Sequence, residues 1–416
     1  MAIALRRGFV GFWAVILASL VSFSLLLTSC SDHRQKDKQA PQPSLSAAEI
    51  LTNGKVKAIA YGSYRTNSRS VVATVEEIKE DLRILSALGF ELIRTYNTQQ
   101  FDEVRRLLIA IDELKQEDPN FSMYVMLGVW IDCEGAFTDA PDHTVEDVEA
   151  NGREIAAAVA FAQAYPETIK IIAVGNEAMV HWASAYFVGP EVILKWVNHL
   201  QSLKQQGQLP IDIWITSSDN FASWGGGDAV YHNEALRQLI EAVDYVSMHT
   251  YPFHDTHYNP DFWRGSAAKG QGASVTEDKT AAIGRALIYA EMQFDSTYAF
   301  VQSVSPGKPV HIGETGWASA DNKLYGANGS NAAGEAAQAL YFDGTLAWTQ
   351  SRGISAVMFE AFDEPWKDAE NPGGSENHFG LIGGHYAKAV LWEEVDQGVF
   401  EGLTRGGHAI VKSRRH

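Results

Sequence analysis

The chain has few of the residues that stabilise small disulfide-bonded folds or attract polyanions. It contains only two cysteines among 416 residues, Cys30 and Cys133, and two cysteines so far apart provide no disulfide framework. Positive charge is also scarce, because 33 Lys and Arg stand against 51 Asp and Glu, for a formal net charge of -18. This balance disfavours nucleic acid or an anionic membrane surface as the main partner.

Apolar and aromatic side chains, by contrast, are abundant. Hydrophobic residues make up 46% of the chain and charged residues 20%, with 11 Trp, 15 Tyr and 19 Phe. This composition excludes a disordered, collagen-like or coiled-coil protein and provides for a large core. An acidic protein rich in Trp and Tyr suits neutral polar ligands, sugars among them.

The first 29 residues have the pattern of a secretory signal. Arg6 and Arg7 precede an apolar run over 8–27, and no acidic residue interrupts it. The run ends in Leu27-Thr28-Ser29-Cys30, which resembles the bacterial lipobox, in which the cysteine is lipidated. An uncleaved membrane anchor is the alternative, because 20 mostly apolar residues also suffice to span a bilayer.

Residues 30–49 are polar and contain proline, which predicts a flexible tether. The folded domain is then expected over 50–416. By resemblance to lipoprotein sorting, Ser31 after the cysteine favours the outer membrane. We therefore expect a lipid-anchored protein of the bacterial cell envelope that faces the periplasm or the cell surface.

Within 50–416, eight short apolar runs alternate with helical patterns. The runs cover 56–64, 91–97, 124–130, 171–177, 212–219, 245–252, 309–317 and 355–364. Their spacing leaves room for a crossover helix each time. Two helices show clear apolar stripes, one at Val75, Ile78, Leu82, Leu85 and Leu88 and one at Val104, Leu107, Leu108, Ile111 and Leu114.

This alternation predicts an α/β protein with a single (β/α)8 TIM barrel and extended loops after the strands. A doubly wound open sheet is the alternative. It is disfavoured because the first strand is not followed by the glycine pattern G-x-G-x-x-G.

Two of the predicted strands end in glutamates flanked by glycine. The fourth ends in Gly175-Asn176-Glu177 and the seventh in Gly313-Glu314, at the end of the barrel where active sites lie. Strand alternation places both glutamates on the face of their strand that lines a shared cavity. Cleavage of a glycosidic bond needs such a pair, with one carboxyl group protonated and the other ionised. The alternative for each glutamate alone is an ion-paired residue at the rim of the barrel.

Motifs on seven of the eight strands match a known family in its own order. They are Tyr61-Gly62, Arg94-Thr95-Tyr96-Asn97, Leu127-Gly128-Val129-Trp130, Val174-Gly175-Asn176-Glu177-Ala178, Tyr251-Pro252-Phe253, Glu314-Thr315-Gly316-Trp317 and the run from Phe359 to Lys367. On these motifs the chain resembles glycoside hydrolase family 17, the β-1,3-glucanase family of the retaining (β/α)8 clan.

The resemblance implies roles for the two glutamates. Glu177 is the implied general acid/base and Glu314 the implied nucleophile of a double displacement, with carboxyl groups about 5–5.5 Å apart. Glu177 is expected to be neutral near pH 7 because of an apolar setting and the charge of Glu314. Arg94 and Tyr251 are the positions that keep Glu314 ionised, and Asn176 is the position that holds the sugar 2-hydroxyl.

The remaining motif residues are implied to bind substrate: Tyr61, Tyr96, Asn97, Trp130, Trp317, Phe362, Glu364 and Lys367. The rings of Trp130, Trp317 and Phe362 suit stacking on sugars, with a packed aromatic at the barrel rim as the alternative. Glu364 and Lys367 either bind sugar hydroxyls or pair with each other. The role of Glu360 stays open.

We expect no catalytic or metal-binding role for several other features of the sequence. His254-Asp255-Thr256-His257 lacks the H-E-x-x-H pattern, so we expect no metal. Cys133 is expected to be an inert thiol, and the glycines at 225–227 are expected to form a mobile loop. Proton transfer and carboxylate attack need no cofactor. Residues 253–275 are expected to overhang the cleft and to influence whether glucan is cut internally or from its ends.

The leading hypothesis is a retaining glycosidase, endo or exo, that cleaves β-1,3-linked glucan. A β-1,3-glucan glucanosyltransferase with the same site is the first alternative, and a non-catalytic glycan-binding lipoprotein of the surface is the second. The expected partner is a neutral β-glucan. We expect a monomer with no nucleic-acid partner and with membrane contact through the lipid anchor only.

Overall fold

The computed structural model describes residues 44–264, apart from 53, 55 and 100, and residues 279–414. The predicted signal peptide, the lipidation site Cys30 and most of the predicted tether lie outside the described residues. In the described ranges, no helix is both long enough and apolar enough to cross a membrane.

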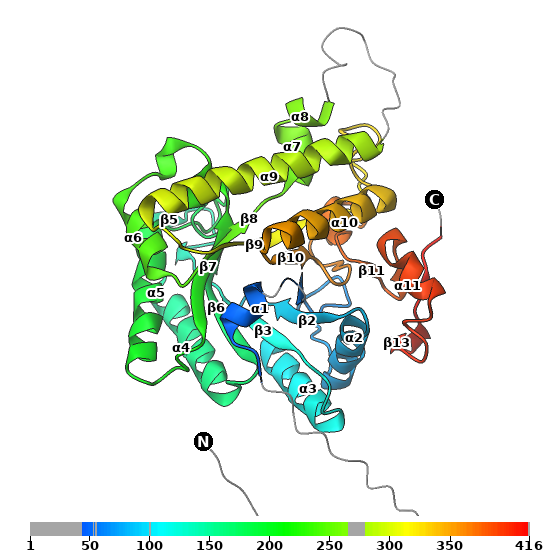
Figure 1. Ribbon diagram of the computed structural model, residues 1–416, viewed down its shortest axis with the longest axis horizontal. Helices are drawn as coiled ribbons and strands as arrows, with labels where there is room; N and C mark the ends of the chain where they lie inside the picture. Colours follow the sequence, from blue (N-terminus) through cyan, green and yellow to red (C-terminus); the bar gives the residue numbers. More distant parts are fainter. Residues whose placement is uncertain (1–43, 53, 55, 100, 265–278, 415–416) are drawn as a thin grey trace, which may run out of the picture. The chain divides into compact units, whose positions relative to one another are not determined.

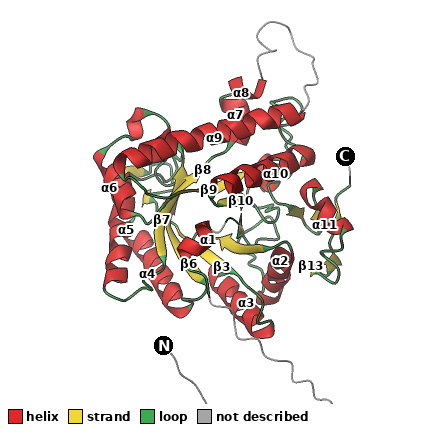
Figure 2. Cartoon of the chain, in the orientation of Figure 1, coloured by secondary structure: helices red, strands yellow, loops and turns green. Residues whose placement is uncertain are grey.

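Eight parallel strands form a closed barrel at the centre of the domain (Figures 1 and 2). The first strand pairs with both the second and the last, which closes the sheet. The (β/α)8 prediction is therefore confirmed and the open sheet is excluded. The strands are β1 (Lys57–Ala60), β2 (Phe90–Arg94), β3 (Tyr124–Val129), β6 (Ile169–Asn176), β7 (Trp214–Asn220), β8 (Val246–His249), β9 (Val310–Gly316) and β10 (Ala356–Phe359).

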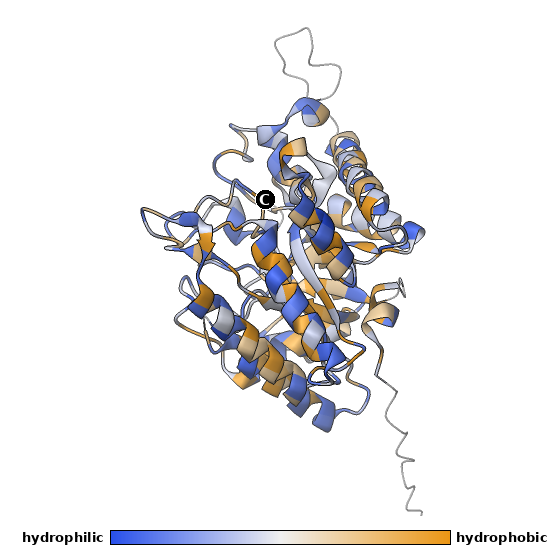
Figure 3. Cartoon of the chain, turned by 90° about the vertical axis from the view of Figure 1, so that its left-hand side faces the viewer, coloured by the Kyte–Doolittle hydropathy of each residue, from blue (hydrophilic) through white to orange (hydrophobic). Residues whose placement is uncertain are grey.

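Helices surround the barrel, and those visible in Figure 3 combine hydrophilic and hydrophobic residues, as expected for helices with one face on a core. Both predicted stripes are confirmed: Ile78, Leu82 and Leu85 are buried on α2, and Val104 and Leu107 are buried on α3. Thr74 and Glu77 form a capping box that fixes the start of α2. The long helices are α2 (Val75–Ala87), α3 (Glu103–Glu117), α4 (Val148–Ala164), α5 (Pro190–Gln205), α6 (Glu234–Ala242), α9 (Lys279–Val304) and α10 (Glu335–Arg352).

Short elements replace a long helix in the described residues after β10. They are η4 (Ser375–Asn377), β11 (Ile382–Gly383), β12 (Tyr386–Ala387), η5 (Ala389–Leu391), α11 (Trp392–Asp396), β13 (Thr404–Arg405), β14 (His408–Ala409) and β15 (Val411–Lys412). Arg405 ties this segment to the barrel, because its guanidinium bonds the buried Asp81 on α2.

A short helix, α1 (Ala47–Thr52), covers the end of the barrel where the strands begin (Figure 1). Ile50 and Leu51 are buried in the cluster that contains Tyr124, the first residue of β3. The Leu45 amide donates to the Tyr124 hydroxyl at 3.0 Å. The folded domain therefore includes residues that the sequence assigned to the tether. They belong to the domain because the few apolar side chains of this segment cover one end of the barrel.

Extended loops lie at the opposite end, as predicted. They carry the hairpin of β4 (Cys133–Glu134) and β5 (Asp142–Glu146), the turns η1 (Ala222–Gly226) and η2 (Ala229–Tyr231), and the helices α7 (Pro252–Tyr258) and α8 (Asp261–Arg264). The described part of the predicted overhang thus forms two short helices.

The prediction of a mobile loop at the glycines of η1 is wrong. The turn is packed, and a Cβ atom at Gly225 would lie 2.2 Å from the Phe300 ring. The neighbouring Trp224 is fully buried, and its indole N–H donates to the Ser247 carbonyl.

Candidate active site

Glu177 and Glu314 line one cleft of about 1050 Å³ at the end of the barrel where the strands finish. Tyr251, Phe359 and Phe379 contribute to the same cleft. A cavity of this volume is at the upper end for small-molecule sites. The two glutamates therefore share a space large enough for several sugar rings.

Local irregularities turn both glutamates toward the cleft. The register of β6 with β7 shifts between Ala173 and Asn176, and Glu177 has φ +46°. The register of β8 with β9 shifts so that β9 has one extra residue, Gly313. The sequence argument assumed that side chains alternate regularly along each strand, and this assumption is wrong at these positions. β-Bulges change the direction of the side chains instead.

Glycine is required at the bulge in β9. A Cβ atom at Gly313 would lie 2.0 Å from the Ser247 hydroxyl oxygen. The bulge therefore packs closely against β8.

Glu314 is surrounded by hydrogen-bond donors. Arg94, fully buried at the end of β2, donates to Oε2. The Tyr96 hydroxyl donates to Oε2 at 3.0 Å and the Tyr251 hydroxyl to Oε1 at 2.5 Å. Burial raises the pKa of Glu314, but the Arg94 charge, with smaller effects of His249 and the two hydroxyls, lowers it to about 2. Glu314 is therefore ionised at neutral pH.

Glu177 has the opposite environment. Burial, and then the negative charge of Glu314, raise its pKa to about 8. Its Oε1 lies 3.1 Å from Nδ1 of His249. Burial lowers the pKa of His249 to about 4, so this imidazole is neutral. Glu177 therefore holds its proton at neutral pH, in the state that a general acid needs.

Arg94 also connects the two walls of the cleft. One guanidinium nitrogen donates to the Gly313 carbonyl at 3.2 Å, and the other donates to Oδ1 of Asn176 at 2.5 Å. Because Oδ1 of Asn176 accepts from Arg94, the amide NH2 group of Asn176 is directed elsewhere and is available as a donor.

Two residues without a predicted role hold the wall that carries Glu177. His249 bonds the Ser218 hydroxyl through Nε2 at 2.7 Å, which fixes the ring that contacts Glu177. Asp219 is fully buried and accepts from the Met179 amide at 2.8 Å. Burial raises the pKa of Asp219 to about 6. The position of His249 two residues before Tyr251 was the one sequence signal for its place near the site.

Three predicted substrate contacts are corrected because their side chains are buried. Tyr61 is 1% exposed, and its hydroxyl donates to Asp81. Trp317 is 1% exposed, and its indole N–H donates to the Ala332 carbonyl. Phe362 is 2% exposed and lies under the Arg405 guanidinium, 4.1 Å from the ring centroid. The packed alternative therefore describes Trp317 and Phe362, and the ring of Tyr61 is buried in the same way, so that none of the three has a face open to a sugar.

Glu364 and Lys367 pair with each other at 3.0 Å, which was the second alternative. Lys367 also bonds Glu360 at 2.5 Å. One oxygen of each glutamate has no hydrogen-bond partner within the described residues. Burial raises the pKa of Glu360 well above its usual range. Asn97 is buried as well, whereas Trp130 is half-buried beside the loops.

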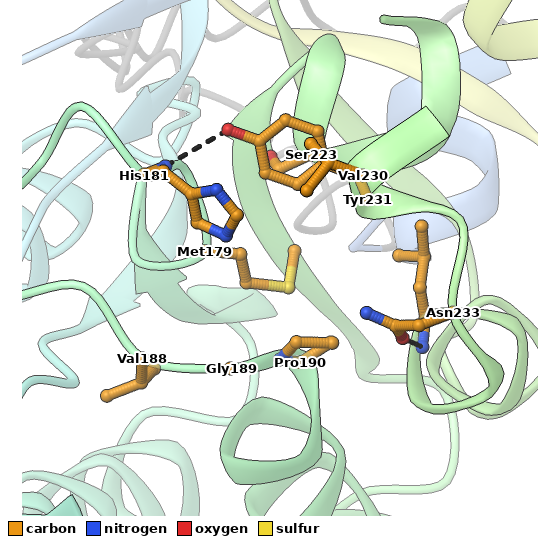
Figure 4. A pocket seen from close by; sticks show the side chains of 10 residues that line it. Met179, His181, Val188, Gly189, Pro190, Ser223, Val230, Tyr231 and Asn233 are labelled. Atoms are coloured by element: carbon orange, nitrogen blue, oxygen red, sulfur yellow. Dashed lines mark hydrogen bonds between the residues drawn. The ribbon is translucent and has the colours of Figure 1, made fainter. Parts of the chain in front are cut away.

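A second, much smaller hollow of about 30 Å³ lies beside the loop that follows Glu177 (Figure 4). Met179, Val188 and Pro190 line it, and the His181 amide donates to the Tyr231 hydroxyl at its edge. This volume fits one or two water molecules and no sugar. The hollow is therefore part of the packing beneath the loop and is not a second sugar site.

The structure also places His254 and Cys133, the remaining residues considered in the sequence analysis. His254 lies in the large cleft and bonds the Tyr325 hydroxyl at 3.1 Å. Among the described residues there is no group of three or more His, Cys, Asp or Glu side chains that suits a metal ion. Cys133 is buried, which raises its thiol pKa.

Comparisons with known proteins agree with this geometry. A family model described as the BtgE/BtgC glycoside hydrolase domain matches residues 58–380. The crystal structure of an endo-laminarinase from Formosa Hel1_33_131 is 55% identical, with a TM-score of 0.85, over 89% of this chain and 94% of that one. The glucan 1,3-beta-glucosidase of Arthroderma benhamiae is 28% identical over 265 residues, which are 62% of this chain and 67% of that protein.

A more distant structure shares the fold. The glycoside hydrolase family 17 β-1,3-glucanosyltransferase of Rhizomucor miehei is 22% identical, with a TM-score of 0.52, over 79% of this chain and 93% of that one. The match to the family model covers most of the barrel, and the motifs at the strand ends agree with it. The chain therefore belongs to the BtgE/BtgC glycoside hydrolases, within glycoside hydrolase family 17.

Proposed function

We propose that the protein is a retaining endo-β-1,3-glucanase in which Glu177 is the general acid/base and Glu314 the nucleophile. The observation that carries the proposal is the pair of glutamates in one cleft, the half-buried Glu177 with a pKa of about 8 and the buried Glu314 with a pKa of about 2. Retaining glycosidases need this unlike pair. The 55% identity to an endo-laminarinase supports both the β-1,3-glucan substrate and internal cleavage.

The mechanism follows from the two protonation states. Glu177 gives its proton to the glycosidic oxygen while Glu314 attacks the anomeric carbon, so the bond to the leaving chain breaks and a glycosyl-enzyme ester forms. Glu177, now ionised, takes a proton from water. That water attacks the same carbon, and Glu314 leaves as a carboxylate. Two inversions retain the configuration.

The neighbours of the two glutamates support these steps. Arg94 and the two tyrosines stabilise the carboxylate of Glu314 before the attack and after release. The amide NH2 group of Asn176, oriented through Arg94, is the proposed donor to the sugar 2-hydroxyl, a contact that strengthens in the transition state.

Incubation of the soluble domain with a linear β-1,3-glucan, followed by chromatography of the products, tests the proposal. A ladder of short oligosaccharides with retained anomeric configuration is the expected result. Release of one small product indicates exo action, and products longer than the substrate indicate glucanosyl transfer. An unchanged polymer rules out an enzyme of this specificity and favours the glycan-binding alternative.

We also propose that the mature protein is a monomeric lipoprotein of the outer membrane, attached through Cys30. The support is the sequence pattern alone: the charged start, the apolar run and the small residues before the cysteine. Metabolic labelling with a fatty-acid analogue is expected to mark the protein but not Cys30→Ala. Equal labelling of both proteins would disprove the attachment site.

A further inference from the structure

Three aromatic rings lie together on the loops that follow β3 and β6, outside the lining of the large cleft. Trp130 follows the last residue of β3, Phe137 lies between β4 and β5, and Tyr186 lies in the loop after β6. The ring centroids of Trp130 and Tyr186 are 5.0 Å apart, and those of Phe137 and Tyr186 are 5.4 Å apart at an interplanar angle of 27°. We call these three residues the aromatic platform.

Phe137 occupies an unfavourable position for its residue type. Its φ is +60°, and its side chain is 62% exposed. A bulky residue at positive φ is an uncommon conformation, and an exposed phenyl ring gives up the stabilisation that burial would supply. The backbone is held there by a hydrogen bond from the Phe137 amide to the Ala185 carbonyl at 2.9 Å. A strained, exposed residue fixed by its surroundings is typical of a functional site.

The platform is connected to the catalytic centre through the loop that follows β6. Tyr186 lies in the same loop as Glu177, nine residues on, and is half-buried. Burial raises the pKa of Tyr186, and the charges of Glu177, Asp219 and Glu314 raise it further. The same loop places Trp182, which is also 62% exposed, in the lining of the large cleft. The loop after β6 thus carries an exposed ring in the cleft lining, Trp182, and a half-buried ring of the platform, Tyr186.

We propose that the aromatic platform binds glucosyl units of a β-glucan chain outside the catalytic cleft, so that the protein holds long chains more tightly than short ones. The proposal deepens the proposed function and depends on it. The apolar C–H faces of pyranose rings pack on aromatic rings, and a neutral polymer is not repelled by a protein of net charge -18. Because the loop that carries Tyr186 also lines the catalytic cleft through Glu177 and Trp182, a segment of the substrate is favoured as the occupant over a second protein.

The test measures binding in a Glu314→Gln background, which binds substrate without turning it over. Dissociation constants are measured for a long linear β-1,3-glucan and for laminaritriose. Adding Phe137→Ala is expected to lower the preference for the polymer over the trisaccharide about fivefold, because one stacked ring is lost. Phe137→Trp is expected to restore the preference. Val145→Ala, on the same hairpin and 43% exposed, is the matched control and is expected to change nothing.

Each other outcome has a definite meaning. An unchanged preference in Phe137→Ala overturns the platform while the proposed function stands. A Glu314→Gln parent that binds no β-1,3-glucan contradicts the proposed substrate instead. If Phe137→Ala alters self-association in sedimentation and not glucan binding, the platform is an interface between copies, and the proposal is wrong. Should Phe137→Ala fail to fold by circular dichroism, Phe137→Asn is used, because asparagine tolerates positive φ.

Discussion

The two walls of the cleft show how one residue type acquires two opposite functions. Glu314 is buried and Glu177 is half-buried, and the loss of solvent raises the pKa of each. The wall of Glu314 adds a guanidinium and two hydroxyl donors, whereas the wall of Glu177 adds a neutral imidazole. The difference in pKa therefore comes from the donors and charges around each carboxylate, not from burial. Substitution of one of these groups at a time is expected to weaken or abolish the contrast between the two walls.

Glu314→Gln is expected to have the largest effect. Loss of the nucleophile prevents formation of the glycosyl-enzyme, so kcat on β-1,3-glucan is expected to fall by at least about 10⁴-fold. The thermal midpoint, measured by circular dichroism, is the control for folding. A folded Glu314→Gln variant with normal turnover would show that another residue attacks the anomeric carbon.

Glu177→Gln is expected to lower kcat on glucan by about 10³-fold, within the range for loss of a general acid. For the wild-type enzyme, activity is expected to fall as the pH rises through about 8, where Glu177 loses its proton. This basic limb of the pH profile is expected to be absent in Glu177→Gln. Persistence of the limb in the variant would assign it to another group.

Arg94→Met is expected to reduce kcat/KM about 10²-fold, the usual loss for one donor at a site of developing charge. Without the guanidinium, burial dominates and the pKa of Glu314 rises. The acidic limb of the pH profile is therefore expected to move from about 2 to a higher pH. Arg153→Met, at an arginine with an exposed side chain on α4, is the control. An acidic limb that stays in place would mean that the tyrosines alone keep Glu314 ionised.

His249→Ala is expected to have the smallest effect, a fall in kcat of about tenfold with little change in KM. The imidazole orients Glu177 without taking part in bond cleavage. His311→Ala is the matched control, because His311 is also buried inside the barrel but bonds the Ser355 amide near the start of β9. Equal losses of kcat in both variants would mean that His249 contributes only packing and does not orient Glu177.

Much of the fold was predictable because it depends on local patterns. The eight apolar runs and their spacing predict the barrel, and the helical stripes of α2 and α3 predict their buried faces. Glu177 and Glu314 were predictable for a related reason, since a carboxylate at the end of an apolar strand is costly unless it is used.

The rest depends on contacts between distant segments. Tyr61 and Trp317 lie in matching motifs, but Asp81 and the Ala332 carbonyl determine where their polar atoms point. The bulge at Gly313 depends on the hydroxyl of Ser247 on the neighbouring strand. His249 gains its place from a hydrogen bond to Ser218, 31 residues away. No pattern along the chain reports such pairings.

The helix α1 determines at which end of the barrel the described chain begins. Residue 44, where the described chain begins, lies beside the starts of the strands, because the Ser44 hydroxyl donates to the Glu167 carbonyl just before β6 and Leu45 bonds Tyr124. Glu177 and Glu314 lie at the opposite pole, where the strands end. The described chain therefore begins at the pole opposite to the cleft, and a polymer of any length that enters the cleft does not meet residue 44.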